Sequence, residues 1–176
     1  MPTETPSNRI MTHAQLLAHG GESFARALRI GRPLSVIVLD IDFFKQVNDT
    51  WGRETGDSVL KGLSEILDQK VRRLDLVGRI HGDEFGLILL DTEKAGACVV
   101  AERLLRTVAT TPFPLPEPFG QREDGPLHVT VSVGVADLAS GGLSLADLFQ
   151  QAEQALVAAK KNGRNRVEVF TGEKEN

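Results

Sequence analysis

The chain has 176 residues, of which 41% are hydrophobic and 25% are charged, and its formal net charge at pH 7 is −4. This composition is typical of a globular protein and argues against fibrous repeats and long disordered tails. The negative charge, together with eight phenylalanines, one tryptophan and no tyrosine, argues against a nucleic-acid-binding or membrane-surface protein.

The length predicts a single domain over residues 1–176, with its core at about residues 8–170. No apolar run approaches the roughly 18 residues that a membrane-spanning helix needs. The first six residues have neither the basic nor the apolar region of a secretory signal. The single cysteine, Cys98, cannot form an internal disulfide. We therefore expect a cytoplasmic location and no membrane segment in this chain.

The first part of the chain predicts a helix, a buried strand and two further helices. The amphipathic pattern of residues 11–29 indicates a helix that a glycine and a proline then end. Residues 34–39 form an apolar, β-branched run typical of a buried strand, which ends at the acidic segment 40–42. Residues 43–49 indicate a short helical turn. Apolar residues three and four apart predict a longer helix over residues 56–71.

The middle of the chain predicts a β-hairpin, a helix and a long loop. Two apolar runs, residues 74–80 and 85–90, flank the short polar segment 81–84, and this pattern is typical of a hairpin. Residues 95–109 have a helical pattern. Residues 111–126 contain five prolines, which predict an exposed loop.

The last part of the chain predicts a strand, a helix and a final strand. Residues 127–135 alternate strictly between valine or leucine and other residues, which is the strongest strand signal in the sequence. A helix is expected over residues 144–160 and a strand over residues 166–170. This order of elements predicts an α/β sandwich, a mixed central sheet with an antiparallel hairpin and helices on its faces.

Acidic residues stand at the ends of two predicted strands. Asp40 and Asp42 end the first strand, and Asp83 and Glu84 lie at the tip of the hairpin. Carboxylate oxygens that converge beside a phosphate are the ligands that Mg²⁺ prefers. Either pair alone is better explained as ordinary turn residues, but four acids at two strand ends favour a metal site. Lys45 follows at the start of a short helix, where free backbone N–H groups can bind phosphate.

Several motifs of this sequence, in this order and at this spacing, resemble the GGDEF domain family, whose active members are diguanylate cyclases. The resemblance extends from about Asn8 to Arg166 and includes a variant of the signature, His-Gly-Asp-Glu-Phe. Its motifs are residues 40–49 (DIDFFKQVND), 56–57 (GD), 79–85 (RIHGDEF), 129–135 (VTVSVGV) and 159–165 (AKKNGRN).

The resemblance implies a fold like that of nucleotidyl cyclases and polymerase palm domains, and the condensation of two GTP into cyclic di-GMP and two pyrophosphates. It implies that Asp40, Asp83 and the carbonyl of Ile41 bind Mg²⁺ or Mn²⁺. Asp83 or Glu84 would help to deprotonate the attacking 3′-hydroxyl, and the sequence does not divide this role between the two residues. Lys45 would steady the phosphates.

The resemblance also implies a set of substrate-binding residues. Asn48 and Asp57 would read guanine, whose N1–H and N2–H₂ donors suit a carboxylate, so Asp57 favours GTP over ATP. Lys160 and Arg164 would hold the terminal phosphates, although by themselves they are equally a solvated helix end. The other expected substrate contacts are Phe43, Phe44 and Arg53. Because each domain holds one GTP, we expect a transient or stable homodimer.

A second binding site is expected at Arg72-Arg73-Leu74-Asp75, which resembles the family's R-x-x-D product site. There Arg72 and Asp75 would bind cyclic di-GMP and inhibit the enzyme. The motif is common, however, and elsewhere normally means a surface ion pair worth less than ~1 kcal/mol.

The signature departs from the family at His81, where the first glycine is expected. A glycine at a hairpin tip usually indicates a positive φ, which histidine tolerates better than most residues. The ring would stand close to the nucleotide. Two functions therefore stay open: an active diguanylate cyclase, which the intact metal, guanine and phosphate positions favour, or a catalytically silent module that senses GTP or cyclic di-GMP. A nucleotidyltransferase acting on another base is disfavoured by Asp57.

Overall fold

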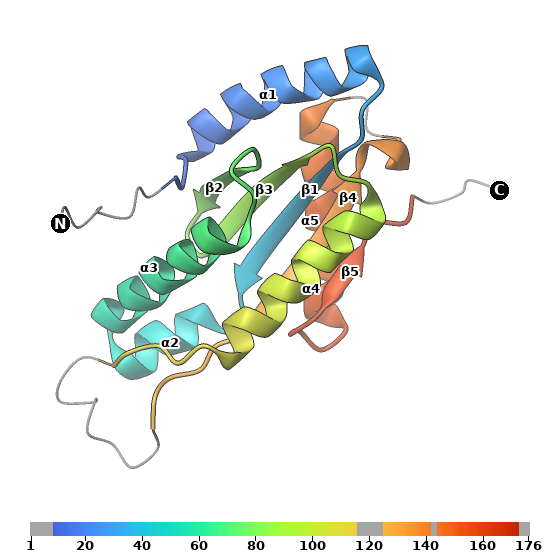
Figure 1. Cartoon of the computed structure of the whole chain (residues 1–176). Helices are drawn as coiled ribbons and strands as arrows, with labels where there is room; N and C mark the ends of the chain where they lie inside the picture. Colours follow the sequence, from blue (N-terminus) through green and yellow to red (C-terminus); the bar gives the residue numbers. More distant parts are fainter. Residues whose placement is uncertain (1–8, 116–124, 142–143, 173–176) are drawn as a thin grey trace, which may run out of the picture.

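The central sheet determines where the acidic residues lie. The computed structural model describes residues 9–115, 125–141 and 144–172, and within them five strands form one sheet in the order β2-β3-β1-β4-β5. β1 (Leu34–Ile41) lies at the centre, antiparallel to β3 (Glu84–Leu90) and β4 (Val131–Asp137) (Figure 1). β2 (Leu76–His81) is antiparallel to β3, and β5 (Val167–Val169) is parallel to β4. The predicted mixed sheet with a hairpin is confirmed.

Helices cover both faces of the sheet. α3 (Arg53–Lys70) and α4 (Lys94–Thr110) pack on one face, and α1 (His13–Ile30) and α5 (Leu145–Lys161) pack on the other (Figure 1). The short α2 (Phe44–Trp51) joins the end of β1 to α3, and a 3₁₀ turn, η2 (Leu138–Ser140), follows β4.

The side chains of β1 explain why the sequence places this strand in the middle. Ile37 and Leu39 belong to the hydrophobic cluster under α3 and α4, whereas Val36 and Val38 belong to the cluster under α1 and α5. All four are at most 1% exposed. A strand that is buried on both faces needs a continuous apolar run, and the acidic residues begin only where this run ends.

Local signals set the ends of the helices. Thr12 caps α1 in a capping box with Gln15, and Gly31 ends the helix in the left-handed conformation, with φ 64°. Ser144 caps α5 by accepting a hydrogen bond from the backbone N–H of Asp147. α3 begins at Arg53, three residues before the predicted start.

The loop and strand after α4 differ from the prediction. β4 begins at Val131 rather than at residue 127, and Leu127 instead forms an isolated antiparallel bridge with Phe113. Phe113 is only 1% exposed, so the prediction that all of residues 111–126 form an exposed loop is wrong at this position. The burial of the ring in the cluster under α3 and α4 outweighs the turn-forming prolines around it. Residues 116–124 lie outside the described residues.

Gly134 brings α5 close to the sheet. A Cβ at this position of β4 would collide with the carbonyl of Ala152 and the backbone N–H of Leu156, both in α5. Only glycine permits this backbone-to-backbone approach. Because α5 carries Lys160 near its C-terminal end, this contact also sets how near Lys160 lies to the end of β1.

Candidate active site

Asp40, at the end of β1, lies where three elements meet. In the pairing of β1 with β3 it is opposite Glu84, so the hairpin brings its acidic tip to the same edge of the sheet. The carboxylate of Asp40 also forms an ion pair with Lys160, with 2.9 Å between Oδ2 and Nζ. The structure thus brings together residues that lie more than a hundred positions apart in the sequence.

The pKa of Asp40 is raised above its ordinary value, chiefly because burial removes the carboxylate from water. The hydrogen bond from Lys160 acts in the opposite direction, and the negative charge of Asp83 raises the pKa further. The two carboxylates that the sequence predicts as metal ligands therefore lie within electrostatic reach of each other. Repulsion of this kind is relieved when a divalent cation binds between the groups.

Glu84 lies in a similar environment. Burial is again the main cause that raises its pKa; the nearby His81 lowers it, whereas Glu153 and Asp40 raise it. The side chain of Glu84 is only 12% exposed, and its Oε2 lies 3.7 Å from Nε2 of the largely exposed His81. A carboxylate whose pKa is raised is a better proton acceptor at neutral pH than an ordinary one, which suits a general base.

The raised pKa of Glu84 predicts that this residue destabilises the fold at neutral pH. Because burial disfavours the charged form, Glu84→Gln should raise Tm at pH 7 by roughly 2–4 °C, the shift expected for about 1 kcal/mol in a chain of this size. A raised pKa in the folded state means that the wild type gains stability as the pH falls, so the advantage of Gln should shrink toward pH 4. Thermal melts at the two pH values measure this.

The exposed Glu65 on α3 provides the control, because Glu65→Gln should leave Tm unchanged at both pH values. Equal melting temperatures of wild type and Glu84→Gln at pH 7 would show that burial of the carboxylate has no cost.

The oxygen donors at the end of β1 and at the hairpin tip suit a divalent metal ion that has further ligands outside the protein. Among the described residues, no three His, Cys, Asp or Glu side chains form a ready-made metal cluster. Two carboxylates, Asp40 and Asp83, with the main-chain carbonyl of Ile41, would leave coordination positions for phosphate oxygens and water. This donor set is hard and incomplete, as is usual for Mg²⁺ bound together with a nucleotide.

Asp42, in contrast, has its oxygens engaged by the protein. It is 4% exposed, and its carboxylate accepts hydrogen bonds from the hydroxyls of Thr130 and Ser132, each at 2.6 Å, and from the backbone N–H of Asn165 at 3.1 Å. The position of Asp42 beside Asp40 in the sequence favours metal binding for this residue as well. The structure gives it a different set of partners, which the sequence did not indicate.

The tip of the hairpin has a different conformation from the one the sequence suggested. His81 and Glu84 are paired across a two-residue turn, and the positive φ of 50° belongs to Gly82. His81 therefore does not adopt the left-handed conformation, which the sequence left open, because it is the last residue of β2. Arg79 holds the turn by donating from Nε to the carbonyl of Gly82 at 2.7 Å.

The N-terminus of α2 lies directly after the acidic end of β1. Phe43 precedes the helix with a φ of 56°, and its exposed ring lies 4.6 Å from the guanidinium carbon of Arg164. Lys45 is exposed in the first turn of α2. The first turn of a helix has free N–H groups, so this position offers backbone donors and two cations to an anion.

The residues predicted to read guanine lie on α2 and α3. Asn48 is half-buried on α2, whereas Asp57 and Arg53 are exposed on α3. Gly56 explains how the two helices approach: a Cβ there would collide with the side-chain amide of Asn48 and would lie 3.2 Å from the ring of Phe44. A glycine before Asp57 is thus required for the amide of Asn48 to occupy its place.

The predicted product site lies at the other end of the hairpin. Arg72 is exposed, whereas Asp75 is 8% exposed and accepts hydrogen bonds from the backbone N–H groups of Arg72 and Leu90, at 3.1 and 3.2 Å. Asp75 therefore stabilises the turn before β2 through backbone donors. The six residue steps of β3 between Leu90 and Glu84 place this turn roughly 20 Å from the acidic edge.

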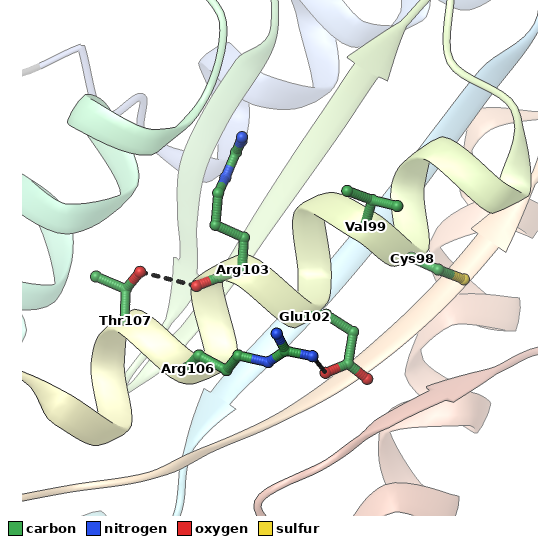
Figure 2. Close-up of a pocket in the computed structure, with 6 residues that line it drawn as sticks. All are labelled: Cys98, Val99, Glu102, Arg103, Arg106 and Thr107. Carbon is green, nitrogen blue, oxygen red and sulfur yellow. Dashed lines mark hydrogen bonds and ion pairs between the residues drawn. The ribbon is translucent and has the colours of Figure 1, made fainter.

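A separate hollow of about 490 Å³ lies on α4 and is distinct from the acidic edge (Figure 2). Arg106 and Glu102 form an ion pair there at 3.9 Å. Arg103 points away from them (Figure 2) and donates to the carbonyl of Lys70 at 2.6 Å, at the end of α3. The residues that line this hollow all belong to α4: Cys98, Val99, Glu102, Arg103, Arg106 and Thr107.

No helix within the described ranges is both long and apolar enough to cross a membrane.

Comparisons with known proteins identify the family of this chain. The family described as "Diguanylate cyclase, GGDEF domain" matches residues 7–166. A diguanylate cyclase of Vibrio cholerae is 35% identical over 162 residues, which cover 92% of this chain and 48% of that protein. The response regulator PleD of Caulobacter vibrioides is 40% identical over 142 residues, 81% of this chain and 30% of that protein. The chain spans half or less of the length of these relatives.

Solved structures are similar over almost the whole chain. The active GGEEF domain of a diguanylate cyclase from Vibrio cholerae superposes with a TM-score of 0.83 at 34% identity, covering 92% of this chain and 98% of that one. The GGDEF domain of DgcB from Caulobacter crescentus, solved in complex with c-di-GMP, gives a TM-score of 0.83 at 27% identity, covering 92% of this chain and 89% of that one. With a family match over most of its length and these relatives, the chain belongs to the GGDEF domain family.

Proposed function

We propose that this chain is a diguanylate cyclase domain that condenses two GTP into cyclic di-GMP and two pyrophosphates. The observation that supports this most is the arrangement at the end of β1, where Asp40 is paired with Glu84 of the neighbouring strand. The negative charge of Asp83 raises the pKa of Asp40, and Lys160 Nζ lies 2.9 Å from Asp40 Oδ2. Family membership supports the same reaction, because the relatives are named as diguanylate cyclases.

The residues divide between metal, base and phosphate. Asp40, Asp83 and the Ile41 carbonyl would hold Mg²⁺ or Mn²⁺, and the bound ion would neutralise charge on the reacting phosphates. Glu84, whose pKa is raised by burial, would accept the proton of the 3′-hydroxyl, alone or together with Asp83. Lys160, which pairs with Asp40 at the end of β1, would also supply positive charge to the terminal phosphates.

The remaining contacts select and orient GTP. Lys45, Arg164 and the N–H groups at the start of α2 would bind the terminal phosphates, next to Phe43 and Phe44. Asp57 would accept hydrogen bonds from the N1–H and N2–H₂ groups of guanine, and the Asn48 amide would meet O6 and N3, with Arg53 nearby. Each domain then holds one GTP, so two domains must face each other to join two nucleotides. We therefore propose that two copies of this chain form a homodimer. We also propose that the chain is a single catalytic domain located in the cytoplasm.

Cyclic di-GMP is also proposed as an inhibitor bound at Arg72 and Asp75. DgcB, a structural relative, was solved in complex with c-di-GMP. Arg72 is exposed at a turn that Asp75 stabilises through backbone N–H groups, so removal of the Arg72 side chain should leave that turn intact.

Arg72→Ala should raise the concentration of cyclic di-GMP that halves the rate by about tenfold, with little change of the initial rate, because the turn lies roughly 20 Å from the acidic edge. Titration of the reaction with cyclic di-GMP measures the effect, and Arg29→Ala, in the last turn of α1, is the matched control. An unchanged inhibition curve would leave Arg72 as an ordinary surface residue.

The dimer requirement gives a test of the proposed reaction. Pyrophosphate release from GTP and Mg²⁺ should show a rate per protein that rises with protein concentration at the dilute end, because two loaded domains must meet. ATP should be turned over far more slowly. Binding of GTP without release of pyrophosphate at any protein concentration would favour the silent binding module instead.

A further inference from the structure

Three contacts join residues 40–43, at the end of β1, to residues 160–165, at the end of α5 and in the turn that follows it. The first is the ion pair at 2.9 Å, the second a hydrogen bond at 3.1 Å and the third a cation–π contact at 4.6 Å. The pairs are Asp40 with Lys160, Asp42 with Asn165, and Phe43 with Arg164. The first and third pairs contain residues assigned above to metal or phosphate, whereas the second pair has no such role.

Asp42 lies at the centre of this junction. The residue is 4% exposed, and a buried carboxylate needs hydrogen-bond donors from the protein. Thr130, just before β4, and Ser132, within β4, supply two of these donors. The third donor, the backbone N–H of Asn165, comes from the turn between α5 and β5. Asp42 therefore ties the end of β1 both to the neighbouring strand and to this turn.

The turn that Asp42 holds has an unusual backbone. Gly163, Arg164 and Asn165 have φ values of 112°, 61° and 46° in succession. Left-handed geometry costs a non-glycine residue roughly 1–2 kcal/mol, so two such residues in a row persist only when surrounding contacts hold them. The contacts present are the Asn165 N–H to Asp42, the Arg164 N–H to the carbonyl of Ala159 at 3.0 Å, and the Arg164 side chain over Phe43.

We propose that Asp42 is a positioning residue that fixes Arg164 at the terminal-phosphate end of the site without touching the nucleotide. Through Asn165 it holds the left-handed turn, and the turn presents the guanidinium of Arg164 over Phe43, beside the N-terminus of α2. This inference rests on the proposed function, because it assumes that Arg164 faces a phosphate. Asp42 thereby takes part in selecting nucleoside triphosphates over diphosphates.

The test compares binding of GDP with binding of a GTP analogue that has a methylene bridge between its α- and β-phosphorus atoms, by calorimetry in the presence of Mg²⁺. The analogue cannot release pyrophosphate, so no turnover occurs during the titration, and it represents GTP in the comparisons that follow. GDP is missing the phosphate that Arg164 would meet. In Asp42→Ala the preference for GTP over GDP should fall by about tenfold, mainly through weaker GTP binding, because a displacement of about 1 Å is enough to lose such a contact. In a turnover assay KM for GTP should rise more than kcat falls.

Two further variants distinguish positioning from a general loss of structure. Thr130→Val removes a donor to the same carboxylate from outside the turn, so it should lower Tm but keep the GTP-to-GDP preference. Asp42→Asn retains an oxygen that accepts from the Asn165 N–H, so it should restore most of the preference lost in Asp42→Ala. In an Arg164→Ala background, Asp42→Ala should cause no further loss of preference, because coupled residues are not additive.

Each outcome decides one point. If wild type binds neither nucleotide, the proposed function fails. If wild type prefers GTP and Asp42→Ala keeps that preference, or if Thr130→Val loses it equally, the positioning role is overturned. If Asp42→Ala does not fold, Asp42→Asn replaces it, with a smaller fall of the preference that disappears in the Arg164→Ala background. Persistence of that fall without Arg164 would also overturn the inference.

Discussion

Asp40→Asn should lower the rate of cyclic di-GMP formation on the order of a thousandfold or more, while the protein keeps its fold. The amide cannot supply the negative oxygen that a divalent cation needs, and loss of one well-placed charge at a reacting phosphate has effects of this size. The pKa of Asp40 is raised by burial, so the neutral isostere should fold at least as well. Product formation and a thermal melt of the same preparation measure both parts.

Asp83→Asn should have the same effect, because Asp83 shares the proposed ion with Asp40. The control is Asp91→Asn, at the other end of β3, where the exposed carboxylate pairs with Arg32 at the surface. This variant should retain normal turnover. Near-normal activity of either Asp40→Asn or Asp83→Asn would show that the two-carboxylate metal site is wrong.

His81→Gly should raise turnover by up to about a hundredfold. Because the positive φ of the hairpin tip belongs to Gly82, His81 carries no backbone strain that glycine would relieve. The effect should come from its ring, which is 75% exposed and lies 3.7 Å from the carboxylate of Glu84, where it would crowd the nucleotide. Glycine inside a strand costs roughly 0.5–1 kcal/mol, so Tm should fall slightly.

His81→Ala separates the ring from the backbone. It removes the same imidazole but keeps the strand preference of a residue with a Cβ, so it should raise turnover as much as His81→Gly does, with a smaller loss of Tm. A decrease of activity in both variants would mean that His81 is a working part of the site, and that its replacement of glycine is an adaptation.

The strands and the acidic edge could be predicted because their signals are local. The apolar run before Asp40 predicts β1 and its end, and the short polar segment between residues 80 and 85 predicts the turn between β2 and β3. The strict alternation of residues 127–135 was less informative. β4 is buried on both faces, so its small or polar positions face other parts of the protein: Ser132 donates to Asp42, and Gly134 lies against α5.

The parts of the site that could not be predicted depend on tertiary contacts. Nothing in the sequence indicates that Asp42 accepts hydrogen bonds from donors that lie about ninety to more than a hundred positions away. Nor does the sequence indicate that Arg79 donates a hydrogen bond to the carbonyl of Gly82 at the hairpin tip. Gly56 was recognisable only as part of a motif, and its physical role became clear from its contact with Asn48. Local patterns place these residues at element ends but do not state their partners.

The most direct measurement is the identification and quantification of the product by mass spectrometry, after incubation of the purified chain with GTP and Mg²⁺. We expect cyclic di-GMP, formed with two pyrophosphates for each molecule, and none above background with Asp40→Asn. Recovery of intact GTP, with no cyclic di-GMP from wild type or from His81→Gly, would contradict the assignment of a diguanylate cyclase active site to the acidic end of β1.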